Sequence, residues 1–443
     1  MSSALAVTGA AHAEDQAASS SLLNDIVVTA QKKNRAERVQ DDPGYTRIDW
    51  KSATSETNID VGLGDGVITN VANYRTLLQD SKLDDGAPVQ VIDFRTYLDQ
   101  EQVSDELRYA GRFWDKLDLT VGLFYFNQNY QYIENRVAAN FAVNRTFGGR
   151  IKQESIGLFA QGELDLTGTL SATLGLRYST EKKHATIHRQ PAGAGLSNCD
   201  YDAKTCNGNF VPSFSDSRRW SAWTPKAGLN WKPSRDALVY LSYSQGVRNG
   251  GYNVRNTSTS YPPPYEPETI KAYEAGFKLD LFDRKLRLNG SFYINDVKAL
   301  QRDVVITATP PETGLIQTVF NATDARFKGL ELEAIVAPVD GVTLNMSLGH
   351  VDPQYKNVTL DLTGDGLIDS KDYALVPPRL SDWTYNIGLM IEQEVANGTR
   401  LTGNVNFGYR SATPANDSNT FWAVKREMLS ATLAVAGHPL PHG

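Results

Sequence analysis

The chain lacks long apolar runs, an excess of positive charge and all but two cysteines. Hydrophobic residues make up 41% of its 443 residues, and no apolar stretch approaches the roughly 20 residues that a membrane-spanning helix needs. A helical membrane protein is therefore excluded. The formal net charge of -7 leaves no basic stripe of the kind that nucleic-acid binding needs, so nucleic acid is not an expected partner. Two cysteines in so long a chain say little by themselves about its redox compartment.

Motifs for catalysis are missing as well. The sequence contains no nucleophile elbow, no defensible order of histidine, carboxylate and serine, and no glycine loop of the kind that cradles phosphate. We therefore expect no enzyme activity and no required cofactor.

Alternation of apolar and polar residues is the pattern that the chain does contain. In residues 273–281 apolar side chains alternate with charged residues or glycine, and residues 286–294 repeat this after the short connection Phe-Asp-Arg-Lys. A period of two indicates an extended strand with two unlike faces, and the short connection predicts an antiparallel hairpin. The same alternation recurs in residues 117–125, 170–178, 342–348, 383–391 and 401–409.

The composition of the two strand faces separates a membrane barrel from a soluble sandwich. A half-buried strand in a sandwich would alternate in the same way. Here, however, the polar face is rich in Asn, Thr, Lys, Arg and Glu, and aromatic residues gather near the ends of the apolar rows. This is typical of an all-β, antiparallel transmembrane β-barrel with an apolar face toward lipid and a polar face toward a wet lumen. We count roughly fourteen such segments of about ten residues each.

The N-terminal part of the chain differs from this pattern. Residues 1–13 are interpreted as a signal peptide clipped at its front, because Ala11-His12-Ala13 fits a small-x-small cleavage site. The alternative is a disordered Ala/Ser terminus. Residues 14–57 are expected to be a disordered N-terminal segment, residues 58–435 the barrel region and residues 436–443 an irregular tail.

A short β-branched piece stands alone in the hydrophilic N-terminal segment, and such a piece suits strand addition to the sheet edge of another protein. It consists of Asp25, Ile26, Val27, Val28, Thr29 and Ala30. This piece resembles the TonB box, the energy-coupling motif of the TonB-dependent receptors of Gram-negative outer membranes. The resemblance continues in residues 105–109 and 119–128, and it is clearest in residues 223–334, where the segments follow in the family's order.

The resemblance implies an outer-membrane receptor that takes up a scarce nutrient, such as a ferric siderophore, cobalamin or a saccharide, with TonB as its partner. Members of the family carry a plug domain inside a barrel of about 22 strands. Here the chain is already barrel-like from Val61, and it ends at Gly443 without the family's terminal aromatic. We therefore expect a receptor without its plug and without some of its strands.

Two other functions stay open at this point. A barrel without a plug would behave as a porin-like passive diffusion channel in the outer membrane. A soluble, calcium-ordered β module that binds glycans outside the cell is the third hypothesis. The apolar row on nearly every strand argues against that module, because it would leave a large apolar patch exposed to water.

The expected loops contain three candidate sites, of which the first is a disulfide. Cys199 and Cys206 lie in a long segment rich in Gly, Ser, Asn and Pro. Exported proteins meet oxidising conditions, and the close spacing of the two residues permits a bridge. Free thiols are the alternative. A zinc site is not expected, since no further Cys or His stands at ligand spacing.

The second candidate is a calcium loop in residues 361–372, which read DLTGDGLIDSKD. The spacing resembles the loops of EF-hand and dockerin-type modules, with Asp in place of Glu at the twelfth position. The alternative is an acidic, glycine-containing turn. Any ion here would be structural. The candidate ligands are Asp361, Thr363, Asp365, Leu367, Asp369 and Asp372.

The third candidate is a stiff aromatic loop. Tyr252, Tyr261 and Tyr265 surround three consecutive prolines at residues 262–264. Such a loop suits stacking against a ligand. The alternative is a rim loop in the interfacial aromatic belt.

Overall fold

The computed structural model describes residues 44–84, 92–138, 143–188, 199–206, 214–255, 264–307, 315–396 and 398–437. Several predicted features lie outside these ranges. They are the signal peptide at residues 1–13, the TonB box at residues 25–30, Tyr261, and the tail from residue 438 onward. The predictions for these features stay predictions.

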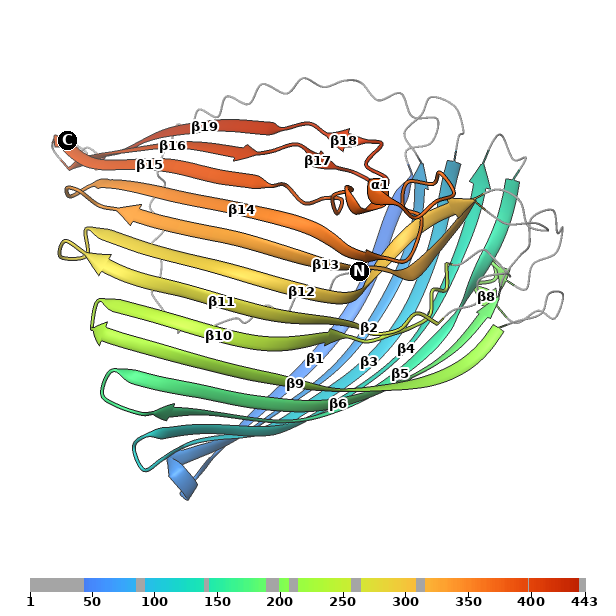
Figure 1. Cartoon of the computed structure of the whole chain (residues 1–443), viewed down its shortest axis with the longest axis horizontal. Coiled ribbons are helices and arrows are strands. Elements are labelled where there is room, and N and C mark those ends of the chain that lie inside the picture. The colour runs from blue at the N-terminus through green and yellow to red at the C-terminus, as the bar shows by residue number, and fades with distance from the viewer. Residues whose placement is uncertain are drawn as a thin grey trace, which may run out of the picture.

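The described residues form one antiparallel sheet of 15 strands, in which each strand pairs with its neighbours along the chain (Figure 1). Its first seven strands are β1 (Tyr45–Val61), β2 (Gly66–Asp84), β3 (Ile92–Phe113), β4 (Leu117–Ala138), β5 (Val143–Asp165), β6 (Leu170–His188) and β9 (Phe214–Ser234). The next four are β10 (Ala237–Arg248), β11 (Glu268–Leu281), β12 (Leu286–Thr307) and β13 (Leu315–Val336). The last four are β14 (Val342–Val358), β15 (Trp383–Ala396), β16 (Thr399–Arg410) and β19 (Arg426–Ala436).

Small elements lie in the connections between the strands of this sheet. Two short ribbons are formed by β7 (Cys199–Asp200) with β8 (Thr205–Cys206), and by β17 (Thr413–Pro414) with β18 (Trp422–Ala423). A 3-10 turn, η1 (Leu63–Asp65), and a helix of one turn, α1 (Ser370–Tyr373), complete the described elements. Within the described ranges, no helix has the length and apolar character needed to cross a bilayer.

The sheet curls along its length, as Figure 1 shows, and in the described residues β1 and β19 each pair on one side only. Tyr45 pairs with Lys82, and Arg426 pairs with Arg410. Both edge strands therefore begin at the same end of the sheet and run in the same direction. A direct pair between them would be parallel, so these two strands cannot close the sheet as an antiparallel pair.

The first strand corrects the predicted domain boundaries. β1 begins at Tyr45, whereas the sequence pattern predicts a disordered segment over residues 14–57 and a barrel that begins at residue 58. The strand pairs with β2 along its whole length, from Tyr45 opposite Lys82 to Val61 opposite Gly66. Its alternation was missed because both of its faces carry polar residues, such as Lys51 on one and Glu56 on the other. The absence of a plug stays a prediction, because residues 1–43 lie outside the described ranges.

The two ends of the sheet differ in the length of their connections. Short turns join the strands at residues 62–65, 114–116, 166–169, 235–236, 282–285 and 337–341. The predicted hairpin of β11 and β12 is confirmed, with Tyr273 opposite Ile294, and Asp283 and Arg284 take the positive φ angles (54° and 65°) that tight hairpin turns require. Most connections at the other end, which we call the loop end, are longer. In outer-membrane barrels short turns face the periplasm and longer loops face the exterior.

The pairing register gives the sheet two chemically different faces. On β10, Leu241 lies opposite Leu229 of β9 and Ala275 of β11, and Ser242 lies opposite Gly228 and Glu274. We call the Leu241 side the apolar face and the Ser242 side the polar face. The apolar face extends from β4 to β19 through Leu123, Leu158, Leu176, Leu229, Leu241, Phe277, Phe292, Leu332, Met346, Ile387, Val405 and Leu433.

Aromatic pairs mark the boundary of the apolar face toward the loop end. The ring centroids of Tyr178 and Trp223 are 4.8 Å apart, and those of Tyr243 and Tyr273 are 5.1 Å apart. Tyr385 and Tyr409 stack at 4.6 Å on β15 and β16. Amphipathic rings at this position are typical of the aromatic girdle between hydrocarbon and headgroups.

Candidate functional site

The chain that follows β10 folds back onto the polar face near the loop end. Tyr252 is only 4% exposed, and its ring centroid lies 6.3 Å from that of Trp220 and 6.1 Å from that of Phe214. Its hydroxyl donates a hydrogen bond to Asp216 Oδ2 at 3.0 Å, and burial raises the pKa of Tyr252. This placement counts against Tyr252 as an exposed ligand contact, because packing and a carboxylate partner already occupy both ends of the side chain.

Tyr265 closes the base of the same loop. Its backbone N–H and C=O exchange two 3.0 Å hydrogen bonds with Gly251. A Cβ at Gly251 would lie 2.7 Å from the Tyr265 hydroxyl, so the ring packs directly over the glycine. Burial raises the pKa of Tyr265. Of the three predicted ligand contacts, Tyr252 and Tyr265 therefore pack within the protein, and ligand contact by them stays a prediction.

Opposite charges alternate on the polar face around this aromatic cluster. Lys183 Nζ lies 2.9 Å from Glu181 Oε1 and donates to the carbonyl of Gly250 at 2.8 Å. Arg218 pairs with Glu266 at 2.8 Å, and both side chains are about half exposed. Such an arrangement holds the cluster in place and leaves fixed charges accessible at the loop end.

A buried carboxylate near the loop end is not among the residues predicted from the sequence. Glu134 on β4 is 0% exposed, and its carboxylate lies 2.6 Å from Arg136 and 3.0 Å from Arg255. The hydroxyl of Tyr132 also donates to it at 2.6 Å. The signal for it lay in the spacing of Tyr132, Glu134 and Arg136, which share one face of the strand. Arg255 comes from the chain after β10, so this ion pair ties that loop to β4.

A fixed cation with aromatic neighbours lies further down the polar face. The Arg177 guanidinium lies over Phe124 at 5.4 Å and over Phe159 at 5.6 Å, measured to the ring centroids. Its Nε donates to Ser179 at 2.8 Å. Cations in such surroundings favour anionic and aromatic ligands.

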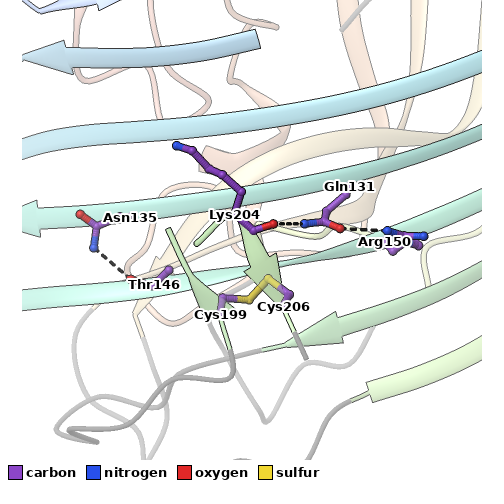
Figure 2. The surroundings of a disulfide bond; sticks show 7 residues. All are labelled: Gln131, Asn135, Thr146, Arg150, Cys199, Lys204 and Cys206. Atoms are coloured by element: carbon purple, nitrogen blue, oxygen red, sulfur yellow. Dashed lines mark hydrogen bonds between the residues drawn. A yellow bond between two sulfur atoms is a disulfide. The ribbon is translucent and has the colours of Figure 1, made fainter. Parts of the chain in front are cut away.

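Cys199 and Cys206 form a disulfide, with an S–S distance of 2.02 Å (Figure 2). The bridge joins the ends of the β7–β8 ribbon, which packs against the sheet at the loop end. The Lys204 carbonyl accepts a 2.8 Å hydrogen bond from Gln131, which in turn accepts one from Arg150 at 3.0 Å, as the figure shows.

Aromatic and charged contacts clamp this ribbon to the outside of the wall. Tyr201 donates to Asp80 at 2.6 Å, and the Arg95 guanidinium lies 4.2 Å from the Tyr201 ring centroid. Asp80, Arg95 and Gln131 belong to the same side of the sheet as the apolar face. The ribbon therefore covers the outer side of β2–β5 and does not enter the lumen side.

Replacing Cys206 with Ser should release the β7–β8 ribbon. Closing so short a loop stabilises it by about 2.5 kcal/mol, which is roughly a 70-fold change in its opening equilibrium. Trypsin should therefore cleave after Lys204 much faster in the variant, as followed by intact-mass analysis of brief digests. The wild type treated with reductant serves as the matched control and should behave like the variant. Equal cleavage rates in the oxidised wild type and the variant would contradict a stabilising role for the bridge.

The predicted calcium ligands form a tight acidic turn whose carboxylates bind groups of the chain itself. Asp361 accepts from the N–H groups of Gly364 and Gly366 at 2.6 and 2.7 Å. Asp365 pairs with Lys371 at 2.6 Å, and this contact lowers the pKa of Asp365. Asp369 caps α1 by accepting from the N–H of Lys371.

Asp372 is the buried member of this turn. It is 0% exposed and accepts from the N–H groups of Leu362, Thr363 and Asp369. Burial works to raise the pKa of Asp372, but these backbone hydrogen bonds outweigh it and the pKa is lowered. Across the described ranges, no group of three or more His, Cys, Asp or Glu residues is placed to hold a metal ion. Calcium binding by this loop stays a prediction.

Calcium is expected to raise the melting temperature of the wild type, and the Asp365→Ala variant is expected not to respond. At ten times its dissociation constant a ligand stabilises the protein by about 1.4 kcal/mol. To bind, calcium must displace the Lys371 ammonium from Asp365. Thermal melts with calcium and with chelator measure the effect. The same shift in melting temperature in both proteins would contradict calcium binding through Asp365.

A model of the family described as TonB dependent receptor-like, beta-barrel matches residues 8–434, which include nearly the whole sheet. The chain belongs to this family. The resemblance of the sequence motifs is thereby confirmed, and the sheet belongs in the outer membrane. The family consists of transport receptors, and the hypothesis of a soluble glycan-binding module is therefore not favoured.

Solved structures and a curated relative agree with this family. The ferric yersiniabactin uptake receptor FyuA from Yersinia pestis covers 88% of this chain at 16% identity, with a TM-score of 0.70. The siderophore receptor PiuA from Acinetobacter baumannii covers 89% at 16% identity, with a TM-score of 0.66. The metal-pseudopaline receptor CntO of Pseudomonas aeruginosa is 26% identical over 182 residues, or 41% of this chain.

The chain spans only part of the length of these proteins. It covers 54% of the FyuA chain and 65% of the PiuA chain, and its alignment covers 21% of CntO. At 16% identity, the likeness to the solved structures shows the fold alone.

Proposed function

We propose that this chain forms part of the wall of an outer-membrane receptor that takes up a metal–siderophore chelate, with energy supplied through TonB. The match of nearly the whole chain to the family model supports a transport receptor. The names of FyuA, PiuA and CntO support a chelated metal as the substrate class.

One observation on the polar face supports a metal–siderophore chelate as the substrate class. Metal chelators bind through anionic oxygen groups that are often attached to aromatic rings. Arg177, held between Phe124 and Phe159, offers such a molecule a fixed cation and two aromatic rings in one place. Arg218, Trp220 and Glu266 provide a second charged and aromatic group nearer the loop end, where a substrate from outside arrives first.

Binding of a ferric chelate by the purified full chain tests this proposal. Quenching of tryptophan fluorescence should report binding, and Arg177→Ala should weaken it about tenfold, or roughly 1.4 kcal/mol. Lys232→Ala is the matched control, because it removes a cation from the same face near the turn end. Equal affinities of the two variants would rule out Arg177 as a substrate contact.

Coupling to TonB is tested separately through the box at residues 25–30. A peptide that adds a strand to a sheet edge needs its backbone N–H groups, and proline removes one. Val27→Pro should abolish capture of the chain by the purified C-terminal domain of TonB. It should also abolish accumulation of radioactive iron in cells. Accumulation that continues in cells without TonB would instead favour a passive, porin-like channel.

A further inference from the structure

The apolar face carries two adjoining hollows over the middle strands of the sheet. One hollow of about 500 Å³ lies between β9 and β12, with Ala227, Leu241 and Ala275 in its lining. The other, of about 490 Å³, lies between β4 and β10 and is also lined by Ala227. Small side chains on neighbouring strands produce the depression, because Ala227 and Ala275 stand beside the larger Leu241. These hollows face the hydrocarbon of the membrane, so acyl chains are what they meet.

Three cations lie above the hollows on the same side of β5, β6 and β9. Lys182 is directly opposite Arg219, and Lys152 is directly opposite His184 one step further along. Strands in a sheet are about 4.8 Å apart, so the three strands place these cations within roughly 10 Å across the sheet. Glu154 is the one acidic residue among these positions on β5, β6 and β9, and it lies opposite Lys182.

These cations are not neutralised by the protein. Lys152 and Lys182 are exposed and form no ion pair with any described residue, and Arg219 donates only a long hydrogen bond to Thr180 at 3.4 Å. Further around the sheet the situation is different. Arg326 pairs with Asp296, and Lys298 pairs with Asp324. The cluster of Lys152, Lys182 and Arg219 therefore presents a net positive charge, whereas Arg326 and Lys298 are each paired with a carboxylate.

The distance along the membrane normal between the hollows and the cation cluster fits an acyl lipid. Six residues of strand separate Leu176, which lines a hollow, from Lys182. At about 3.4 Å per residue and a tilt of about 40°, this is roughly 15 Å along the membrane normal, or about half the hydrocarbon thickness. Tyr178 and Trp223 lie between the two levels and mark the boundary of the hydrocarbon.

We propose that this strip of β5, β6 and β9 binds a phosphorylated acyl lipid of the outer leaflet. An acyl chain occupies the hollows, and a phosphate lies at the cluster of Lys152, Lys182 and Arg219. Arg recognises phosphate through two parallel hydrogen bonds, and the lysines add flexible positive charge. The proposal concerns the outside of the wall and does not depend on what passes through the lumen.

Native mass spectrometry of the full chain in detergent tests the proposal, with diphosphoryl lipid A as the probe and phosphatidylcholine, a zwitterion whose phosphate is balanced by its own ammonium group, as the net-neutral reference. Each basic residue near an anionic surface strengthens association about fivefold. The triple variant Lys152→Gln, Lys182→Gln, Arg219→Gln should therefore retain lipid A about 100-fold less well. Its retention of phosphatidylcholine should not change.

Two further variants keep the test decisive. Lys298→Gln with Arg326→Gln removes two paired cations at a similar height and should leave lipid A retention within twofold of the wild type. Ala227→Trp fills both hollows and should weaken the binding of both lipids. The proposal is overturned if the triple variant and the paired-cation variant lose lipid A equally. It is also overturned if filling the hollows leaves retention unchanged.

Discussion

Leu241→Arg is expected to lower the free energy of unfolding of the membrane-inserted chain by about 2 kcal/mol, because a cation on the lipid face costs about 2–4 kcal/mol at the bilayer midplane and less toward the boundary that Tyr243 marks. Leu241 is 56% exposed on the apolar face, and it lies between Leu229 and Ala275 of the neighbouring strands. In the membrane this exposed surface meets hydrocarbon, which cannot solvate a guanidinium. Guanidinium titration of the chain in phospholipid vesicles measures the loss.

Ser242→Arg is the matched control for this prediction. Ser242 is the next residue of the same strand, and its side chain points to the polar face, opposite Gly228 and Glu274. An arginine there stays in water and lies near a carboxylate, so the free energy of unfolding should change by less than about 1 kcal/mol. Equal losses from both substitutions would contradict the assignment of the two faces. A larger loss from Ser242→Arg would reverse it.

The strands that alternate cleanly could be predicted from the sequence alone. The hairpin of β11 and β12 follows directly from the period of two and the short turn. The sheet has 15 strands, close to the roughly fourteen expected. β1 could not be predicted from alternation. Lipid contact is what imposes an apolar row, and this strand carries polar side chains on both faces. Alternation detects a strand only where its two faces meet different surroundings.

The candidate sites depended on packing that local spacing does not report. The bridge between Cys199 and Cys206 could be predicted from the sequence because a short segment keeps its two ends close together. The positions of the loop tyrosines could not be predicted in this way. Tyr252 is held by Trp220 and Phe214, which belong to β9, a strand that is not adjacent to it in the sequence. Glu134 and Arg255 are likewise far apart in the chain. Their pairing depends on how the chain after β10 folds back onto β4, and spacing along the sequence does not report that.

Glu134→Ala is expected to detach the loop that follows β10, at a cost of about 3 kcal/mol. The substitution leaves Arg136 and Arg255 without the carboxylate that both of them contact. Breaking a buried ion pair costs about 3–5 kcal/mol, and the lower figure applies because Arg255 is 38% exposed and keeps some of its hydration. Hydrogen exchange of the backbone amides of Tyr252 and Val254 should accelerate by roughly 100-fold, since each 1.4 kcal/mol is a factor of ten.

A double-mutant cycle separates the ion pair from the loss of side-chain volume. Glu134→Ala with Arg255→Ala should cost less than the sum of the two single substitutions, because the double variant leaves one fewer unpaired charge. Glu392→Ala is the control at an exposed pair: Glu392 and Arg400 are 41% and 65% exposed, so its loss should stay below about 1 kcal/mol. Strict additivity of Glu134→Ala and Arg255→Ala would show that the two residues do not interact, and that the loop is held by the packing of Tyr252 alone.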